Sequence, residues 1–265
     1  MNYRHIFHAG NFADTFKHSV LTLLLSYLLR KDKPCTFIDT HAGLGLYDLE
    51  DEQSKRTGEA EQGILKLLKA QSHIPELDEY LRIVKQYLNG KHSFYPGSPL
   101  FMKAFQRNKD VIILNELHKK DIEVLRENFA GSKGVHIHHR DAYEFLPAIL
   151  PPVNKRGLIL IDPPFEKTNE LQQFQHAFEK AFLRFPTGIF MLWYPIINQK
   201  TELNISRLMR SLPQNSLRSE VIIRAVTHDS KSLNGSGLII VNPPYKVEVP
   251  IQKIASYLQA EFSDL

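Results

Sequence analysis

Short apolar runs alternate with amphipathic segments along most of this chain, and that alternation limits the folds it can adopt. Five of the runs have the length and composition of buried strands: 35–38, 111–114, 135–139, 158–161 and 188–193. Most are separated by segments whose apolar residues recur at helical spacing. Strands that alternate with helices form a mostly parallel sheet covered on both faces. We therefore predict a single α/β domain over residues 1–265.

Two stretches depart from the alternation. Residues 46–97 hold no convincing strand, and the segments 59–70 and 76–88 have the pattern of amphipathic helices, so we expect a small helical insertion over 46–97. Near the C-terminus the runs 217–226 and 237–241 follow one another, and we expect them to form an antiparallel pair. The sheet is then predicted to have seven strands, the last of them antiparallel.

The run 158–161 ends in Asp162-Pro163-Pro164-Phe165, an unusual way to leave a sheet. Prolines cannot continue a strand ladder, and they hold the backbone rigid. The Asp162 carboxylate and the Pro163 carbonyl are therefore expected at the sheet edge, beside the ring of Phe165. Such a site suits a flat substrate with an amino group, because the ring stacks on it and the oxygens accept its hydrogens. A nucleobase is the obvious candidate.

Other strand ends carry acidic or glycine-rich turns as well: Asp39 with Gly43 and Gly45, then Glu116 and Asp141. Ligands of doubly wound sheets bind outside the carboxyl ends of the strands, so these residues are expected to share one rim with Asp162. There Gly43 allows close approach to the backbone, Glu116 suits the hydroxyls of a ribose, and Asp141 suits an adenine amine. Each alone is as well explained as a cap or turn former. Four in register favour a nucleoside-bearing ligand, and the missing third glycine argues against a pyrophosphate.

The N-terminal segment interleaves aromatic and cationic side chains, among them Tyr3, Arg4 and Lys17. That mixture suits a flipped base and its phosphates. It equally suits an arm that packs its aromatic rings onto the domain. The residues alone leave both interpretations open.

A second proline motif, Asn242-Pro243-Pro244-Tyr245, follows the run 237–241. In the usual strand order that run lies two strand spacings, roughly 10 Å, from the run that ends at Asp162. We therefore interpret the second motif as a strand terminator.

Composition sets further limits. A net charge of +4 and a pI near 9.0 suit a polyanionic partner without requiring one. The single cysteine, Cys35, excludes an internal disulfide and fits a reducing cytoplasm.

The sequence suggests neither a membrane contact nor a metal site. The longest apolar run, 20–29, is too short to span a bilayer, and we expect neither a signal peptide nor a membrane contact. His136 and His138 share a strand face, but no third ligand is evident, so we expect no metal.

Together these motifs resemble the class I S-adenosylmethionine-dependent methyltransferases of the amino type, whose fold is Rossmann-like. More closely, nearly the whole chain is similar to the bacterial 23S ribosomal RNA adenine-N6 methyltransferase family, ribosomal RNA large subunit methyltransferase J. The matching segments are Tyr3-Arg4-His5, Phe7 to Asn11, Lys17-His18, Asp39 to Gly43, Tyr95 to Pro99, Glu116-Leu117-His118, Gly157 to Pro164, and Trp193-Tyr194-Pro195.

The resemblance implies that the cofactor is S-adenosyl-L-methionine and that six side chains line its site: His18, His41, Ser98, Glu116, Asp141 and Asp162. It also implies that Asp162 is the catalytic acceptor and that Tyr3 and Lys17 lie near the RNA; we place Arg4 with them. Ala142 stands where the family commonly has glycine, and Phe165 where many relatives have tyrosine. We keep Ala142 among the predicted cofactor contacts, and stacking by Phe165 survives the loss of a hydroxyl.

We accordingly expect a cytoplasmic, monomeric enzyme that methylates the N6 amine of an adenine in 23S ribosomal RNA, with Asp162, Pro163 and Phe165 at the reacting base. DNA adenine and protein glutamine are alternative acceptors for the same chemistry. A non-catalytic RNA-binding or ribosome assembly factor on the same fold is the alternative outside the enzymes.

Overall fold

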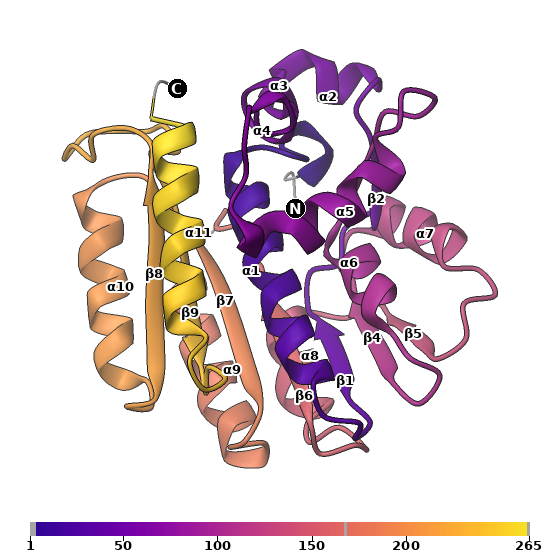
Figure 1. Cartoon of the computed structure of the whole chain (residues 1–265). Helices are drawn as coiled ribbons and strands as arrows, with labels where there is room; N and C mark the ends of the chain where they lie inside the picture. The colour runs from indigo at the N-terminus through magenta and orange to yellow at the C-terminus, as the bar shows by residue number, and fades with distance from the viewer. Residues whose placement is uncertain (1–3, 167–168, 264–265) are drawn as a thin grey trace.

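The computed structural model describes residues 4–166 and 169–263, and a seven-stranded sheet runs through the centre of the molecule (Figure 1). The strand order is β5-β4-β1-β6-β7-β9-β8. Their bounds are β1 (Thr36–Asp39), β4 (Val111–Asn115), β5 (Val135–His138), β6 (Gly157–Ile161), β7 (Ile189–Ile196), β8 (Ser216–Ile222) and β9 (Gly235–Val241). All neighbouring pairs are parallel except those of β9, which runs antiparallel to both β7 and β8. The predicted sheet and its antiparallel last strand are confirmed.

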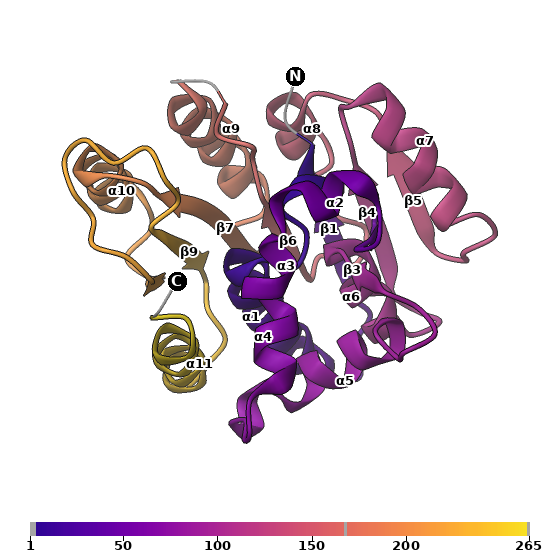
Figure 2. The same cartoon turned by 90° about the horizontal axis from the view of Figure 1, so that it is seen from above.

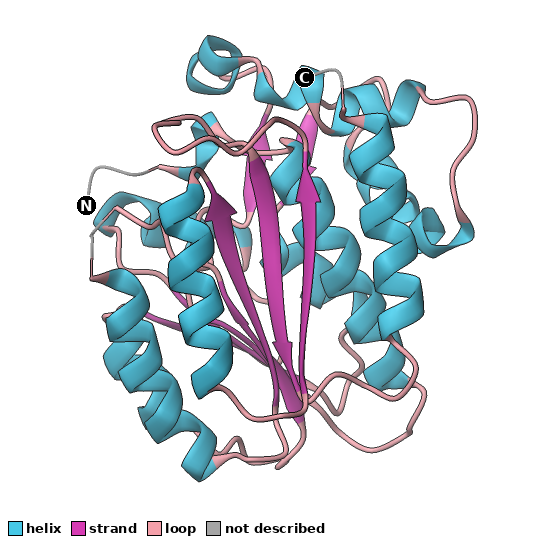
Figure 3. Cartoon of the chain, turned by 90° about the vertical axis from the view of Figure 1, so that its left-hand side faces the viewer, coloured by secondary structure: helices cyan, strands magenta, loops and turns pink. Residues whose placement is uncertain are grey.

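Helices cover both faces of the sheet (Figure 3). One face carries α1 (Phe12–Leu29), α6 (Ser98–Phe105) and α11 (Glu248–Glu261), and the other carries α8 (Ala142–Ala148), α9 (Glu170–Arg184) and α10 (Gln199–Ser211). Helix α7 (Lys119–Asn128) links β4 to β5. Side chains alternate between the faces of a strand, so Leu158 and Leu160 of β6 join the α1 core, while Ile159 and Ile161 join the α9 core. Because both faces are buried, the strands have continuous apolar sequences.

The insertion contains two strands, so the prediction that residues 46–97 hold none is wrong. Strands β2 (Leu46–Asp48) and β3 (Phe94–Pro96) form a small antiparallel pair. Each is only three residues long, too short to show a period of two. Between them lie the helical elements α2 (Glu52–Thr57), α3 (Glu59–Gln62), α4 (Ile64–Lys69), η2 (Pro75–Leu77) and α5 (Asp78–Tyr87), which Figure 2 shows gathered beside α1.

The helix predicted over 59–70 is broken at Gly63. A Cβ at this position would lie 2.2 Å from the backbone oxygen of Gly10, so the insertion approaches the start of α1 through a backbone-to-backbone contact. The Ile64 N–H donates to that same oxygen, at 2.8 Å. The break therefore follows from a tertiary contact that helical periodicity does not report.

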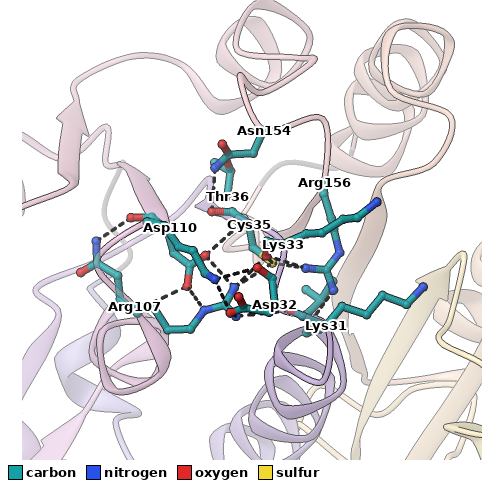
Figure 4. A network of polar contacts seen from close by, with 12 residues as sticks. Lys31, Asp32, Lys33, Cys35, Thr36, Arg107, Asp110, Asn154 and Arg156 are labelled. Carbon is teal, nitrogen blue, oxygen red and sulfur yellow. Dashed lines mark hydrogen bonds and ion pairs between the residues drawn. The ribbon is translucent and has the colours of Figure 1, made fainter.

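The edge of the sheet at which β1 begins is closed by a network of polar contacts that includes Cys35, Arg107, Asp110 and Arg156 (Figure 4). Arg107 Nε donates to Asp110 Oδ2 at 2.7 Å, and Asp110 Oδ1 accepts the Cys35 N–H at 2.8 Å. Arg156 Nη1 lies 2.7 Å from the Cys35 sulfur. Burial raises the pKa of this thiol, which keeps it protonated. These groups satisfy one another, and we interpret the network as structural.

Candidate active site

A cavity of about 230 Å³ lies at the opposite edge, outside the carboxyl ends of the parallel strands. Nearly every predicted site residue lines it: Lys17, His18, His41, Gly43, Ser98, Glu116, Asp141, Ala142, Asp162 and Pro163. Phe165 and Arg4 are not among its lining residues, and Tyr3 falls outside the described residues. The convergence follows from parallel strand direction, which brings turns 39–45, 115–118, 140–142 and 162–165 to one rim.

Gly43 and Glu116 form one wall of the cavity. Gly43 has a φ of +59°, and a Cβ there would lie 2.1 Å from the Tyr47 hydroxyl oxygen, so the turn needs glycine. Glu116 is nearly buried; its Oε2 accepts the Gly43 N–H at 2.8 Å, and its Oε1 accepts the His118 N–H at 2.7 Å. Burial raises the pKa of Glu116. Both oxygens are thus fixed in place and keep further acceptor capacity for a ligand hydroxyl.

Asp141 is both a helix cap and a cavity residue. Its Oδ1 accepts the Tyr143 N–H at 2.9 Å and the Glu144 N–H at 3.3 Å, at the start of α8. Both cap bonds use Oδ1, so Oδ2 is the oxygen available to a ligand. The cap interpretation and the ligand interpretation are therefore compatible.

Asp162 is held by a buried lysine. Lys17 Nζ lies 2.5 Å from Asp162 Oδ2 and 2.8 Å from Asp14 Oδ1. The Lys17 side chain is only 4% exposed, against 14% for Asp162. Burial alone lowers the pKa of Lys17, but the two carboxylates outweigh it and raise that pKa, so the ammonium persists. Asp14 Oδ2 in turn lies 2.9 Å from His5 Nε2 and accepts the Gly10 N–H at 3.0 Å.

An aromatic pair stands beside this ion pair. The rings of Phe165 and Trp193 meet edge to face, with their centroids 5.9 Å apart. Lys17 Nζ lies 5.6 Å from the centre of the Trp193 ring, within cation–π range. Phe165 has a φ of +51°, uncommon for a residue with a side chain and typical of a functional turn. The motif therefore places Asp162 in the cavity lining and Phe165 outside it, against Trp193.

His18, His41 and Asp39 have strongly displaced ionisation. Burial lowers the pKa of His18, whose Nδ1 lies 2.8 Å from the Tyr95 hydroxyl, and lowers that of His41 to about 4, so both rings are neutral at pH 7. Burial raises the pKa of Asp39 to about 7. Asp39 Oδ1 accepts the His41 N–H at 3.0 Å, while its buried Oδ2 has no hydrogen-bond partner among the described residues. Asp39 lies behind the cavity lining rather than in it.

The sequence did not point to several residues of the site. Tyr143 and Glu170 line the cavity from the starts of α8 and α9, and only packing brings them there. Asp14 is another residue that the sequence analysis did not single out. Its position three residues before Lys17 was the available signal, because residues at that spacing are neighbours on a helix.

The predicted RNA residue Arg4 makes intramolecular contacts. Its Nη1 donates to Gln53 Oε1 at 2.8 Å, and its Nη2 lies 3.3 Å from Asp121 Oδ1. These bonds hold the N-terminal segment against α2 and α7. They match the packed-arm interpretation of this residue, whereas Lys17 reaches the cavity.

The second proline motif is at the other edge of the sheet. Since β9 is antiparallel, its final residue Val241 pairs with Phe190, near the start of β7. Asn242 has a φ of +55°, and its Nδ2 donates to the carbonyls of Pro186 at 2.8 Å and Gly188 at 2.9 Å. The strand-terminator interpretation is confirmed.

Within the described ranges, no helix combines the length and apolar character that a membrane crossing needs. The same residues contain no group of three His, Cys, Asp or Glu side chains arranged to hold a metal ion. The ring of His138 instead packs against Phe145, with centroids 5.3 Å apart.

Known proteins resemble the chain over almost its full length. The family model described as "Ribosomal RNA large subunit methyltransferase D, RlmJ" matches residues 32–264. Ribosomal RNA large subunit methyltransferase J of Escherichia coli (strain K12) is 38% identical over 265 residues, which cover 98% of this chain and 94% of that protein. The protein of the same name from Haemophilus influenzae is 36% identical and covers 97% and 92%. The crystal structure of protein LPL1258 from Legionella pneumophila superposes with a TM-score of 0.89 at 37% identity, covering 97% of this chain and 94% of that one.

Proposed function

Since this chain belongs to the family of ribosomal RNA large subunit methyltransferase J, we propose that it transfers a methyl group from S-adenosylmethionine to the N6 amine of an adenine in 23S ribosomal RNA. The observation that carries the choice of chemistry is the Asp162 carboxylate, held by Lys17 at the rim of the cavity and next to an aromatic face. An acceptor oxygen beside a stacking surface suits a planar amine.

The residues present fit the cofactor. Fixed Glu116 suits the two hydroxyls of a ribose, and Asp141 Oδ2 suits the adenine amine of the same nucleoside. Because Gly43 has no side chain, a ligand in the cavity can approach the backbone of this turn closely. His18, His41, Ser98 and Ala142 complete the proposed set. When bound, S-adenosylmethionine supplies a methyl group activated by its positively charged sulfur.

The proposed chemistry is mostly positioning. An adenine amine is a poor nucleophile because its lone pair is delocalised into the ring. Asp162 and the Pro163 carbonyl accept its two hydrogens, which favours a tetrahedral nitrogen, and Phe165 stacks on the base. Lys17 fixes the orientation of the Asp162 carboxylate before the base arrives. Such preorganised electrostatics account for much of the rate of many enzymes.

The RNA side of the site is proposed on fewer residues. Lys17 lines the cavity at which the base is proposed to react, and we propose that Tyr3 and Arg4 also contact the RNA. We further propose that the protein acts as a monomer in the cytoplasm, which suits its single domain and its one buried thiol.

An acceptor panel tests the proposal. Purified protein is incubated with labelled S-adenosylmethionine and, separately, with protein-depleted 23S ribosomal RNA, assembled large subunits, DNA and a glutamine peptide. We expect N6-methyladenosine in the 23S RNA only. Transfer to DNA or peptide would move the assignment to another acceptor, and cofactor binding with no transfer to any acceptor would favour a non-catalytic factor.

A further inference from the structure

A second cavity lies beside the candidate active site, between the start of α1, helix α3 and the loop that joins β8 to β9. Its volume of about 360 Å³ lies within the range of small-molecule sites, roughly 300–1,000 Å³. The loop and α3 both lie at the upper edge of the molecule in Figure 1. Eight residues line the cavity: His8, Asn11, Phe12, Glu59, Gln62, Ile223, Arg224 and Leu233.

The lining combines an apolar part with a polar part. Phe12, Ile223 and Leu233 supply the apolar lining. Phe12 and Ile223 are only 7% and 6% exposed, and Leu233 is half-buried. The rings of Phe12 and Phe262 meet edge to face, with centroids 6.5 Å apart. An apolar lining beside hydrogen-bonding groups suits a planar ring with a polar edge, which is the chemistry of a nucleobase.

The acidic residue of this cavity is already hydrogen-bonded within the protein. Glu59 Oε1 lies 2.8 Å from His8 Nδ1, and Glu59 Oε2 accepts a hydrogen from Asn11 Nδ2, also at 2.8 Å. The hydrogen bond to Glu59 raises the pKa of His8, so the pair is favoured as an ion pair. Gln62 and Arg224 are both exposed, so an amide and a guanidinium are presented to solvent at the cavity. Guanidinium groups suit phosphate.

The same two elements, η1 and the start of α1, contribute lining residues to both cavities. His5 lines the first and His8 the second, and both belong to the turn around η1 (His5–Phe7). At the 3₁₀ rise of about 2.0 Å per residue they are roughly 6 Å apart along the backbone. On α1, Phe12 lines the second cavity and Lys17 the first, about 7.5 Å apart at 1.5 Å per residue. The two cavities are therefore separated by η1 and the first turns of α1.

We propose that the second cavity holds a nucleotide next to the methylated adenosine, with its base against the apolar lining and beside Gln62, and its phosphate at Arg224. The inference rests on the proposed RNA substrate. Moving an adenine out of its stack leaves its neighbour unstacked, and sequence-specific RNA recognition targets such splayed bases. The second cavity then selects the strand, while the first performs the transfer.

The test uses a ribosomal RNA fragment that contains the adenosine methylated by the wild-type protein. KM for this fragment is measured for Gln62→Ala, Arg224→Ala and the matched control Arg210→Ala, which removes an exposed arginine near the distal end of α10. Each flanking nucleotide of the fragment is also replaced in turn by an abasic one. We expect both cavity variants to raise KM about tenfold, with unchanged affinity for S-adenosylmethionine and no effect of the control.

The abasic series separates base from phosphate recognition. At one flanking position, loss of the base should raise the KM of the wild-type protein by a larger factor than that of Gln62→Ala, because the variant has already lost its contact with the edge of the base. The same change should add fully to Arg224→Ala, because the phosphate remains. Unchanged KM in both cavity variants, or additive effects with Gln62→Ala at every position, overturns the inference while the methylation itself stands. A wild-type protein that methylates no ribosomal RNA overturns the proposed function, and this inference with it.

Discussion

Two turns of this molecule have nearly the same sequence pattern and opposite roles. Asp162-Pro163-Pro164-Phe165 follows a parallel strand and lies at the cavity, whereas Asn242-Pro243-Pro244-Tyr245 follows the antiparallel strand and lies at the other edge of the sheet. In the first, the polar side chain contacts Lys17; in the second, it contacts two backbone carbonyls. Strand direction, rather than the motif, decides which of the two is presented to a ligand.

The largest expected effect comes from exchanging the polar residues of the two motifs. Asp162→Asn keeps the shape but replaces one acceptor oxygen by a donor, so kcat for methyl transfer should fall at least about 10²-fold. Asn242→Asp should neither raise activity alone nor restore it in the double variant. Methyl incorporation and thermal unfolding are measured for all three proteins. A folded Asp162→Asn protein with wild-type kcat contradicts the assigned role.

Lys17 is the next difference between the two motifs. Among the described contacts of Asn242, no lysine takes the place that Lys17 has beside Asp162. Lys17→Met leaves Asp14 buried with one partner fewer and removes the orientation of Asp162. We expect a loss of roughly 3 kcal/mol in the free energy of unfolding and a fall in kcat of about 10²-fold. Lys17→Arg, which keeps the charge, is the control. Denaturant unfolding and initial rates on the same samples distinguish the two effects, and a stable, fully active Lys17→Met protein would exclude both.

Much of this arrangement was predictable from the sequence, for a physical reason. Apolar runs and the polar residues that end them are local signals, and parallel direction alone brings Gly43, Glu116, Asp141 and Asp162 to one rim. Contacts that depend on packing were not predictable in this way. The lysine bridge joins residues 145 positions apart, and the break at Gly63 depends on the Gly10 carbonyl.

The two strands of the insertion were not predicted from the sequence, for a related reason. A three-residue strand such as β2 is too short for a periodic pattern, and its pairing with β3 closes a loop of about fifty residues. The resemblance to a family supplied roles for His18, His41 and Ser98 that no local pattern indicated. All three line the cavity, while their contacts to a cofactor stay a prediction.

A smaller effect is expected from removing the structural role of the second motif. Asn242→Ala loses two hydrogen bonds to backbone carbonyls and places an ordinary residue at φ +55°, so unfolding should become easier by about 1–3 kcal/mol. Asn242→Gly loses the same bonds but tolerates the backbone conformation, and should be less destabilised than Asn242→Ala. The kcat per folded molecule should match wild type in both. A loss of kcat at full folding would link this turn to the site and weaken the contrast between the two edges.

The last contrast separates the two edges by pH, because Asn242 carries no titratable group while His41 at the cavity and Asp39 behind it do. The pKa of His41 is lowered to about 4, so between pH 6.5 and 4 the unfolded chain binds the extra proton and this residue makes folding less stable as pH falls. The pKa of Asp39 is raised to about 7, so between pH 7 and 4 the folded chain binds the extra proton and stability rises as pH falls. The two contributions oppose each other in the wild-type protein, each with a slope of at most about 1.4 kcal/mol per pH unit. His41 is partly exposed to the cavity, so its slope should be the smaller.

Three variants test these contributions. Relative to wild type, His41→Asn should gain stability on acidification and Asp39→Asn should lose stability. Asn242→Ala should differ from wild type by the same amount at every pH. Denaturant midpoints between pH 4 and 7 measure these differences, and parallel curves for all four proteins would show that the buried charges behind the cavity are not linked to folding.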